Sequence, residues 1–138
     1  MTRTTRHAVA PVGEEGTPSG FSQGFVVSLG NARMLSVAGQ VAVRDGQLVG
    51  RGDVAAQAEC CYRRIGEIVA AAGGTMADVV ASHVYLLDIS SLAEVARVRR
   101  EHFGDPYQPP ASTAVEVSAL AIEGALVEID ATAVIAIA

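Results

Sequence analysis

The sequence predicts a single α+β domain, in which a mixed β-sheet carries two helices of unequal length on one face. Three observations support this class. Two β-rich apolar runs stand near the start of the chain, two segments with helical periodicity follow, and strand-like runs separate and close them. The chain has 138 residues and half of them are hydrophobic, so residues 1–138 are expected to form one domain around one core.

The first part of the chain predicts an arm followed by a hairpin. Residues 1–18 are expected to be an irregular arm, because proline and glycine recur in them. The runs 24–29 and 33–38 are apolar and rich in β-formers. Gly30-Asn31 lies between these runs and predicts a tight turn, since both residues tolerate positive φ.

The second strand of this hairpin is interrupted by Gly39-Gln40 and is expected to continue through residues 41–43. A glycine within a strand often marks a bulge or a close approach of a ligand to the backbone. Asp45-Gly46 then predicts the next turn.

A first helix is expected from Asp53, a good N-cap residue, to about Ala72. Gly73-Gly74 follows it as a stop signal. Apolar residues recur in this segment at spacings of three and four and form one stripe. They are Val54, Ala58, Cys61, Ile65, Ile68 and Ala72.

The second half predicts one capped turn at 75–78, a strand at 79–87 and a second helix at about 92–103. Ser91 and Glu94 have the spacing of a capping box for this helix. Arg97, Arg99 and Arg100 have the spacing of a solvated helix face. Residues 115–117 and 126–137 are expected to complete the sheet.

Composition excludes several classes of function. The net charge is −5 and no run of lysine or arginine occurs, which argues against nucleic-acid binding. No apolar run reaches the roughly 18 residues that a membrane span needs, and no signal peptide is evident. We therefore expect a cytoplasmic protein. The mean hydropathy of +0.34 is high, which favours burial of apolar surface between subunits.

The two cysteines, Cys60 and Cys61, are neighbours on the predicted helix and point about 100° apart, so they cannot pair with each other. We expect one thiol to be packed and the other to be exposed. No Cys/His spacing indicates a zinc site, and no cofactor is predicted.

The order of these elements, together with a set of short landmarks, resembles the reactive intermediate deaminase (Rid, or YjgF/RidA-like) family over nearly the whole chain. Each landmark is weak alone, but their order and spacing are specific. They are Ala38-Gly39-Gln40, Asp53-Val54-Ala55-Ala56-Gln57, Ala72-Gly73-Gly74, Asp78-Val79-Val80, Leu87-Asp88, Pro110-Ala111, Val115-Glu116-Val117 and Val127-Glu128-Ile129.

The resemblance implies a chorismate-mutase-like α+β fold that assembles as a homotrimer with three clefts between neighbouring subunits. It also implies a cofactor-free site that hydrolyses small imines and enamines. In family deaminases an arginine directly after the Pro-Ala pair holds the substrate carboxylate, because a guanidinium matches a carboxylate with two hydrogen bonds.

This chain departs from that pattern at several positions. Ser112 stands in place of the arginine, and Phe21, Ala38 and Ala96 replace a tyrosine, a serine and an asparagine. Glu128 matches the acidic residue that the family uses to position water. The lost charge predicts that this protein is not a typical 2-aminoacrylate deaminase.

The candidate site therefore consists of Glu128 as the catalytic group, with Gly39 and nearby amides holding a carbonyl or imine and Phe21 forming a wall. Ala38, Ala96, Ser112 and Thr113 complete the proposed substrate-binding set. Each residue also has a structural interpretation. Glu128 fits a solvent-facing strand position, and the two hydroxyls could simply bond to nearby backbone groups.

Several alternatives remain open at this level. His83 is either a sheet residue or a proton carrier. Arg33 and Arg44 lie on strands from which either could replace the missing cation. The main hypothesis is an imine- or enamine-hydrolysing trimer, and the alternative is a trimer that binds a metabolite without chemistry. Endoribonuclease activity is disfavoured by the acidic charge.

Overall fold

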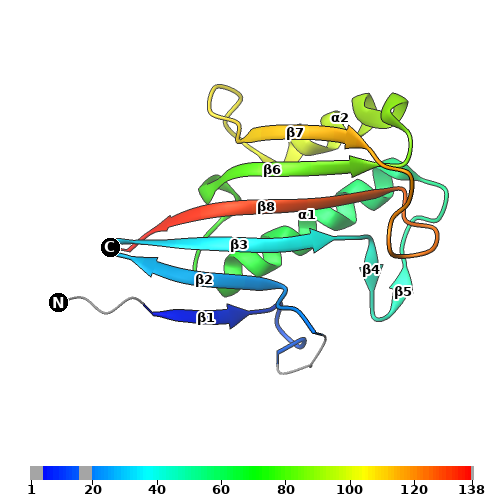
Figure 1. The fold of residues 1–138 in the computed structure, drawn as a ribbon. Coiled ribbons are helices and arrows are strands. Elements are labelled where there is room, and N and C mark those ends of the chain that lie inside the picture. Colours follow the sequence, from blue (N-terminus) through cyan, green and yellow to red (C-terminus); the bar gives the residue numbers. More distant parts are fainter. Residues whose placement is uncertain (1–4, 16–19, 138) are drawn as a thin grey trace.

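The computed structural model of the protein describes residues 5–15 and 20–137. One six-stranded sheet forms a layer, and the two long helices lie side by side on one of its faces (Figure 1). The strands follow the spatial order β1-β2-β3-β8-β6-β7, and all neighbours are antiparallel except β6 and β7. The predicted α+β class with both helices on one face is confirmed.

The elements have the following bounds. The sheet contains β1 (Arg6–Val9), β2 (Gly24–Leu29), β3 (Ala32–Gln40), β6 (Val79–Leu86), β7 (Ala111–Glu116) and β8 (Val127–Ala136). A separate hairpin is formed by β4 (Val43–Arg44) and β5 (Gln47–Leu48). The helices are α1 (Val54–Ala71) and α2 (Leu92–His102), with short 3-10 turns η1 (Met76–Asp78) and η2 (Ile89–Ser91).

The predicted irregular arm contains a strand. β1 pairs with β2 in a register that places Arg6 opposite Val27, so the prediction for residues 1–18 is wrong at residues 6–9. Three of the four β1 residues are exposed, and the strand is held by backbone hydrogen bonds rather than by an apolar face. For this reason the sequence of β1 has no alternation of polar and apolar residues that would predict a strand. Residues 1–4 and 16–18 of the predicted arm lie outside the described residues.

The β2–β3 hairpin and the bulge after it are confirmed. Gly30 adopts a φ of +62° in the two-residue turn, as a hairpin turn of this length requires. The register of β3 against β8 shifts between Val37 and Gln40, so Gly39 lies in a bulge. The chain does not continue as the same strand through 41–43. It turns into the β4–β5 hairpin instead, where Asp45 and Gly46 both have positive φ.

Helix α1 begins and ends close to the predicted residues. The Asp53 carboxylate accepts a hydrogen bond from the Ala56 amide at 3.0 Å, and Gly73 follows the helix with a φ of +88°. Both cysteines are buried, so the prediction of one exposed thiol is wrong. Burial raises the pKa of the Cys61 thiol far above its ordinary value, which leaves it protonated.

Helix α2 begins at Leu92 and ends at His102, close to the predicted bounds, but its N-terminus is capped differently. Ser91 makes no side-chain cap bond, and its hydroxyl donates to the Asp88 carbonyl instead. Asp88 caps the preceding η2 turn by accepting from the Ser90 amide at 2.9 Å. The predicted capping box of Ser91 and Glu94 is therefore wrong. The η2 turn precedes the helix, and the Ser91 hydroxyl bonds within that turn instead of to the first amides of α2.

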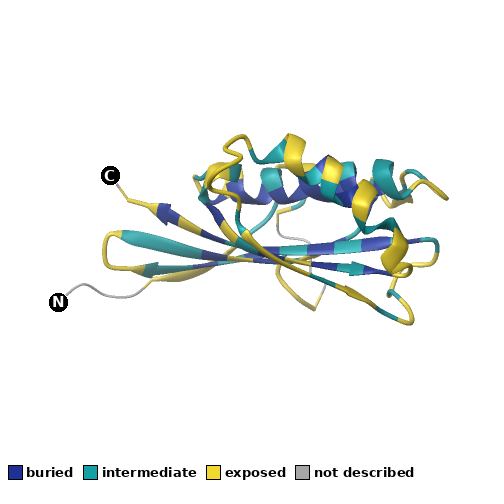
Figure 2. Ribbon diagram, turned by 90° about the horizontal axis from the view of Figure 1, so that it is seen from above, coloured by how far each residue is buried: buried dark blue, intermediate teal, exposed yellow. Residues whose placement is uncertain are grey.

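The far face of the sheet is open, as the view from above shows (Figure 2). Along β8, every second residue from Val127 to Ile135 is buried under the helices, and the residues between them face the open side. This open face is only partly apolar. Val134 is exposed there, yet Asp130 on the same face accepts from the Tyr85 hydroxyl at 3.3 Å and pairs with His83 at 2.9 Å.

No helix among the described residues is long and apolar enough to cross a membrane.

Candidate functional site

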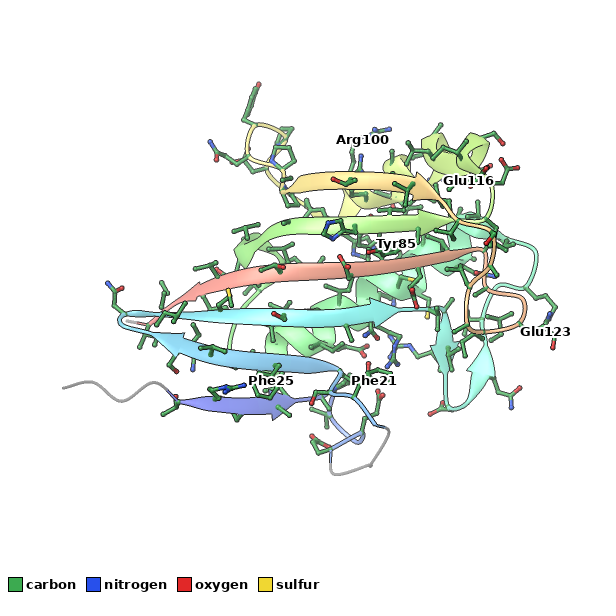
Figure 3. All side chains as sticks on the ribbon, in the orientation of Figure 1. Phe21, Phe25, Tyr85, Arg100, Glu116 and Glu123 are labelled. Carbon is green, nitrogen blue, oxygen red and sulfur yellow. The ribbon has the colours of Figure 1, made fainter. Side chains whose placement is uncertain are left out.

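A cavity of about 1030 Å³ opens where the bulge of β3 meets the second half of α1 and the segment before β2. Phe21, Gly39 and Glu128, three of the predicted site residues, line it together. Phe21 lies just before β2, at the end of the sheet that faces the β4–β5 hairpin (Figure 3). Three residues that were proposed from separate parts of the sequence therefore line one cavity.

The bulge brings the Glu128 side chain against the backbone of β3. A Cβ atom at Gly39 would lie only 2.9 Å from the Glu128 Cδ, so a side chain at position 39 would push the carboxylate away. Glu128 is half-buried, and its carboxylate accepts no hydrogen bond from any described residue. Its oxygens are thus available to a water molecule or a ligand in the cavity.

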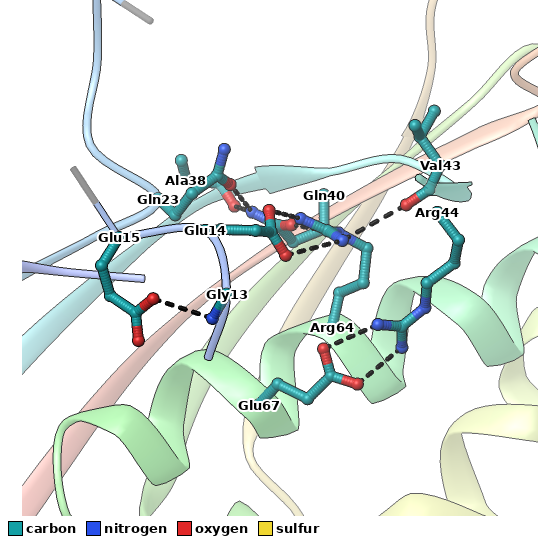
Figure 4. Close-up of polar contacts among 10 residues, drawn as sticks. All are labelled: Gly13, Glu14, Glu15, Gln23, Ala38, Gln40, Val43, Arg44, Arg64 and Glu67. Atoms are coloured by element: carbon teal, nitrogen blue, oxygen red, sulfur yellow. Dashed lines mark hydrogen bonds and ion pairs between the residues drawn. The ribbon is translucent and has the colours of Figure 1, made fainter. Parts of the chain in front are cut away.

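A buried guanidinium belongs to the same cavity. The Arg64 side chain is only 10% exposed and projects from α1. Its Nε donates to the Gln40 Oε1 at 2.9 Å, and its Nη1 donates to the Val43 carbonyl at 3.2 Å. The carboxylate of Glu14 takes the outer side of the guanidinium, at 3.0 Å from Nη2 and 3.4 Å from Nη1 (Figure 4).

Gln40 connects this guanidinium to the strand that carries Gly39. Its Nε2 donates to the Gln23 Oε1 and to the Ala38 carbonyl, both at 2.9 Å. Ala38, a predicted binding residue, thus contributes its backbone carbonyl to the frame of the cavity and does not line the cavity itself.

A second ion pair lines the cavity next to Arg64. Arg44 donates two hydrogen bonds to Glu67, at 2.7 and 2.8 Å (Figure 4). These bonds raise the pKa of Arg44 and lower the pKa of Glu67. Arg44 therefore reaches the cavity, but its charge is already compensated within the chain. Arg33 does not line this cavity and lies near Gly73.

The remaining predicted residues lie at the other side of the sheet. Ser112 and Thr113 are on β7, the edge strand, and β6 and β8 separate them from β3. Ala96 is half-buried on α2. Thr113 lies in register with His83 on β6. Within one chain these residues do not meet Phe21, Gly39 and Glu128.

Position 112 has a cation beside it after all. Nη1 of Arg99, one helical turn after Ala96, donates to the Ser112 Oγ at 3.1 Å. The sequence left open whether Arg33, Arg44 or another cation replaces the missing arginine, and the cation that contacts Ser112 comes from α2. Arg99 also lies near the buried Tyr62 hydroxyl. Burial raises the pKa of Tyr62 to about 12, and the Arg99 charge opposes part of that rise.

Comparisons with known proteins decide the family. The profile of the family described as Endoribonuclease L-PSP matches residues 17–135. A RutC family protein of Pyrococcus horikoshii is 35% identical over 131 residues, which cover 94% of this chain and 93% of that protein. The chain belongs to the Rid family. Human 2-iminobutanoate/2-iminopropanoate deaminase is 31% identical over 136 residues, 97% of this chain and 93% of the human protein.

Solved Rid-family structures share the fold. The crystal structure of Rv2704 from Mycobacterium tuberculosis, a member of the YjgF/YER057c/UK114 family, superposes with a TM-score of 0.73 at 36% identity. The match covers 94% of this chain and 98% of that one. The shared fold therefore includes the elements that carry the Glu128 cavity and those that carry the Arg99–Ser112 pair.

Sequence analysis did not identify Glu14, Arg64 or Arg99 as site residues. Arg64 carried a usable signal, because it interrupts the apolar stripe of α1 next to Cys61 and Ile65, and a charge in such a stripe needs a partner. Glu14 and Arg99 carried none, since their roles depend on contacts with distant elements.

Among the described residues, no cluster of histidine, cysteine, aspartate and glutamate could hold a metal ion.

Proposed function

We propose that this Rid protein hydrolyses a small imine or enamine at a cleft between the subunits of a homotrimer. The observation that carries the proposal is the Glu128 carboxylate, which lies in the cavity beside Gly39 without a hydrogen-bond donor from the described chain. A free carboxylate at the wall of a cavity is suited to take a proton from water.

The reaction adds one water to the C=N bond. The substrate enters as the protonated imine. Glu128 accepts a proton from the water as its oxygen attacks the imine carbon, which gives a neutral carbinolamine. The carboxyl group then returns this proton to nitrogen, the C–N bond breaks to release ammonia, and the carbinolamine hydroxyl gives its proton to the Glu128 carboxylate as the carbonyl forms. Backbone groups beside Gly39 would hold the substrate, and Phe21 would form an apolar wall of the cleft.

The trimer is part of the proposal because one chain holds the candidate residues in two places. The Glu128 cavity lies at β3 and β8, whereas Arg99, Ser112 and Ala96 lie at the β7 edge. A neighbouring copy that packed its β7 edge against the cavity would bring the two sets together. Half-exposed apolar residues on the open face, such as Val115 and Val134, support such packing.

Arg99 changes the substrate class that this cleft would accept. The prediction that this protein is not a typical 2-aminoacrylate deaminase depended on a missing charge, and Arg99 places a guanidinium nitrogen 3.1 Å from the Ser112 hydroxyl. Relatives named 2-iminobutanoate/2-iminopropanoate deaminase act, by their names, on imino acids with a carboxylate. We therefore include such imino acids among the proposed substrates.

The test is release of ammonia and 2-oxo acid from imino acids that are generated in the assay by an amino-acid oxidase. Glu128→Gln is expected to lower the turnover number at least about a hundredfold, because general base catalysis contributes roughly 10²–10⁴. Glu123→Gln, at an exposed loop position labelled in Figure 3, is the matched control and is expected to keep full activity. Equal turnover by the two variants would remove Glu128 from the mechanism.

Binding without chemistry is the second candidate, since both cavity arginines are already paired with glutamates and the cavity could hold a neutral ligand. A stable complex with no ammonia release would favour it. We do not propose endoribonuclease activity, although the family description carries that word. The net charge of −5 opposes approach of a phosphate backbone.

A further inference from the structure

We infer that Arg64 is a binding point for small carboxylates, and that Glu14 is an internal carboxylate that occupies this point in the free protein. The ligand class is a small organic monocarboxylate, which would replace the Glu14 side chain on the guanidinium. Binding at this point requires no turnover, so the inference goes beyond the proposed hydrolysis.

The first argument is that Arg64 is held in place without Glu14. The Nε donates to Gln40, whose own amide is fixed by Gln23 and Ala38, and Nη1 donates to the Val43 carbonyl. The side chain is 10% exposed and rises from the middle of α1. A ligand would therefore meet an oriented guanidinium, with both terminal nitrogens directed toward the position of the Glu14 carboxylate.

The second argument is that Glu14 is joined to the rest of the chain mainly through its carboxylate. It lies in a tight turn in which the Glu14 amide donates to the Pro11 carbonyl at 3.0 Å and Gly13 has a φ of +91°. A further hydrogen bond among the described residues of this segment, from the Gly13 amide to Glu15, is also internal. Val12, at the tip of the turn, is 93% exposed, whereas Pro11 at its start is buried. The Glu14 carboxylate can therefore leave Arg64 while Pro11 stays in place, and among the described residues its hydrogen bonds to other parts of the chain are those to Arg64.

The third argument is that a buried guanidinium must keep an anionic partner. Leaving such a charge unpaired is strongly unfavourable, so Glu14 can leave only when another anion takes its place. A carboxylate reproduces both hydrogen bonds of Glu14, and a neutral amide does not. Arg44 does not compete for the ligand, because Glu67 already holds it with two hydrogen bonds.

The cavity gives the ligand room. Its volume of about 1030 Å³ is at the upper end of small-molecule sites, and Glu14 itself lines it. An occupant at Arg64 would share the cavity with Glu128 and Phe21. Glu14 therefore controls access to a second contact for an anionic molecule, separate from the Ser112–Arg99 pair on β7.

Acetate and propionate are the probes for this inference, with acetamide and propionamide as uncharged isosteres. Affinity is measured by titration of the Arg64 Nε–Hε signal in ¹⁵N-correlated NMR spectra. Glu14→Ala removes the internal competitor and is expected to bind both carboxylates at least about tenfold more tightly than the parent protein, with no gain for the amides.

Glu15→Ala is the matched control, because it removes a carboxylate of the same charge one residue away. Among the described residues, the hydrogen-bond partner of the Glu15 carboxylate is the Gly13 amide. It is expected to bind acetate as the parent does. The inference fails if Glu14→Ala keeps its folded spectrum and yet binds acetate no more tightly than Glu15→Ala, or if acetamide binds equally well. In either case Glu14 is only a structural partner of Arg64.

Discussion

The guanidinium groups of Arg64 and Arg99 are stabilised by different kinds of partner. Arg64 lies on α1 with 10% of its side chain exposed, and a glutamate, a glutamine and a backbone carbonyl surround its guanidinium. Arg99 lies half-buried on α2 and donates a hydrogen bond to a serine hydroxyl on β7. The first is compensated within the chain, whereas the second is held by a neutral group.

The difference follows from burial. A buried guanidinium requires an anion and pays a large desolvation cost without one, while a partly exposed guanidinium can still be stabilised by water. We therefore expect Arg64 to matter most for stability in the free protein, and Arg99 to matter most when an anionic ligand is present. The predictions below separate these two roles.

The largest expected effect is on stability at Arg64. Arg64→Met is expected to lower the free energy of unfolding by about 3 kcal/mol, because it leaves the Gln40 side-chain oxygen and the Val43 carbonyl without their donor and removes the ion pair with the partly exposed Glu14. Urea unfolding at fixed protein concentration measures this change. Arg63→Met is the control, since Arg63 makes an exposed pair with Glu59 and should cost under about 1 kcal/mol. If both variants lost a similar amount of unfolding free energy, burial of Arg64 would not explain its contribution to stability.

An intermediate effect is expected on catalysis at Arg99. Arg99→Met should lower kcat/KM for imino acids about tenfold to a hundredfold, since one charge-assisted contact is worth roughly 1.5–3 kcal/mol. Imines without a carboxylate should be hydrolysed at the parent rate. Arg97→Met is the control, because Arg97 pairs with Glu101 on the exposed side of α2. A loss of the same size for charged and uncharged substrates would show that Arg99 supports the fold and not the ligand.

The smallest effect is on the pH dependence of stability. Arg44 lowers the pKa of Glu67, so the folded state binds this proton less readily than the unfolded state, where the carboxyl titrates near its ordinary 4.5. The stabilisation is complete above that value and is lost as the pH falls through the lower folded pKa. Because the Glu67 side chain is 41% exposed, solvent screening keeps the contribution small.

Glu67→Gln should therefore reduce the loss of stability between pH 5 and 3 by under about 1 kcal/mol. Urea unfolding at each pH checks this. Asp45→Asn, at the tip of the neighbouring hairpin, is a comparison at a carboxylate with no ion pair. An unchanged acid slope in Glu67→Gln would show that the Arg44 pair does not couple to folding.

The sequence predicted the elements that have strong local signals. Alternation and helical periodicity identified β2, β3, β6, β8, α1 and α2 nearly to the residue, and Gly39 marked the bulge. It missed β1, whose four residues are held by pairing with β2 and not by burial. It placed the start of α2 correctly at Leu92 but assigned the wrong cap, because Asp88 caps a short turn before the helix and the Ser91 hydroxyl bonds to the Asp88 carbonyl.

The site divides in the same way. Gly39 and Glu128 could be proposed because family landmarks contain them, and Phe21 because it stands in place of a family tyrosine; all three line one cavity. The cation near Ser112 could not be predicted, because it comes from a helix residue and reaches β7 through packing alone. Glu14 lies in a segment whose composition indicates only an irregular arm, and its role depends on the path that β1 gives to the chain.

The pairing of β1 with β2 has a consequence for how this family member could diverge. Four residue pairs fix where the chain leaves the sheet edge, and the turn with Glu14 follows within a few residues. A slip of one residue would move that turn by about 3.3 Å and reverse the faces of the strand. A single insertion or deletion between Val9 and Glu14 would thus withdraw the carboxylate and unblock the guanidinium, while every residue of α1 stayed unchanged.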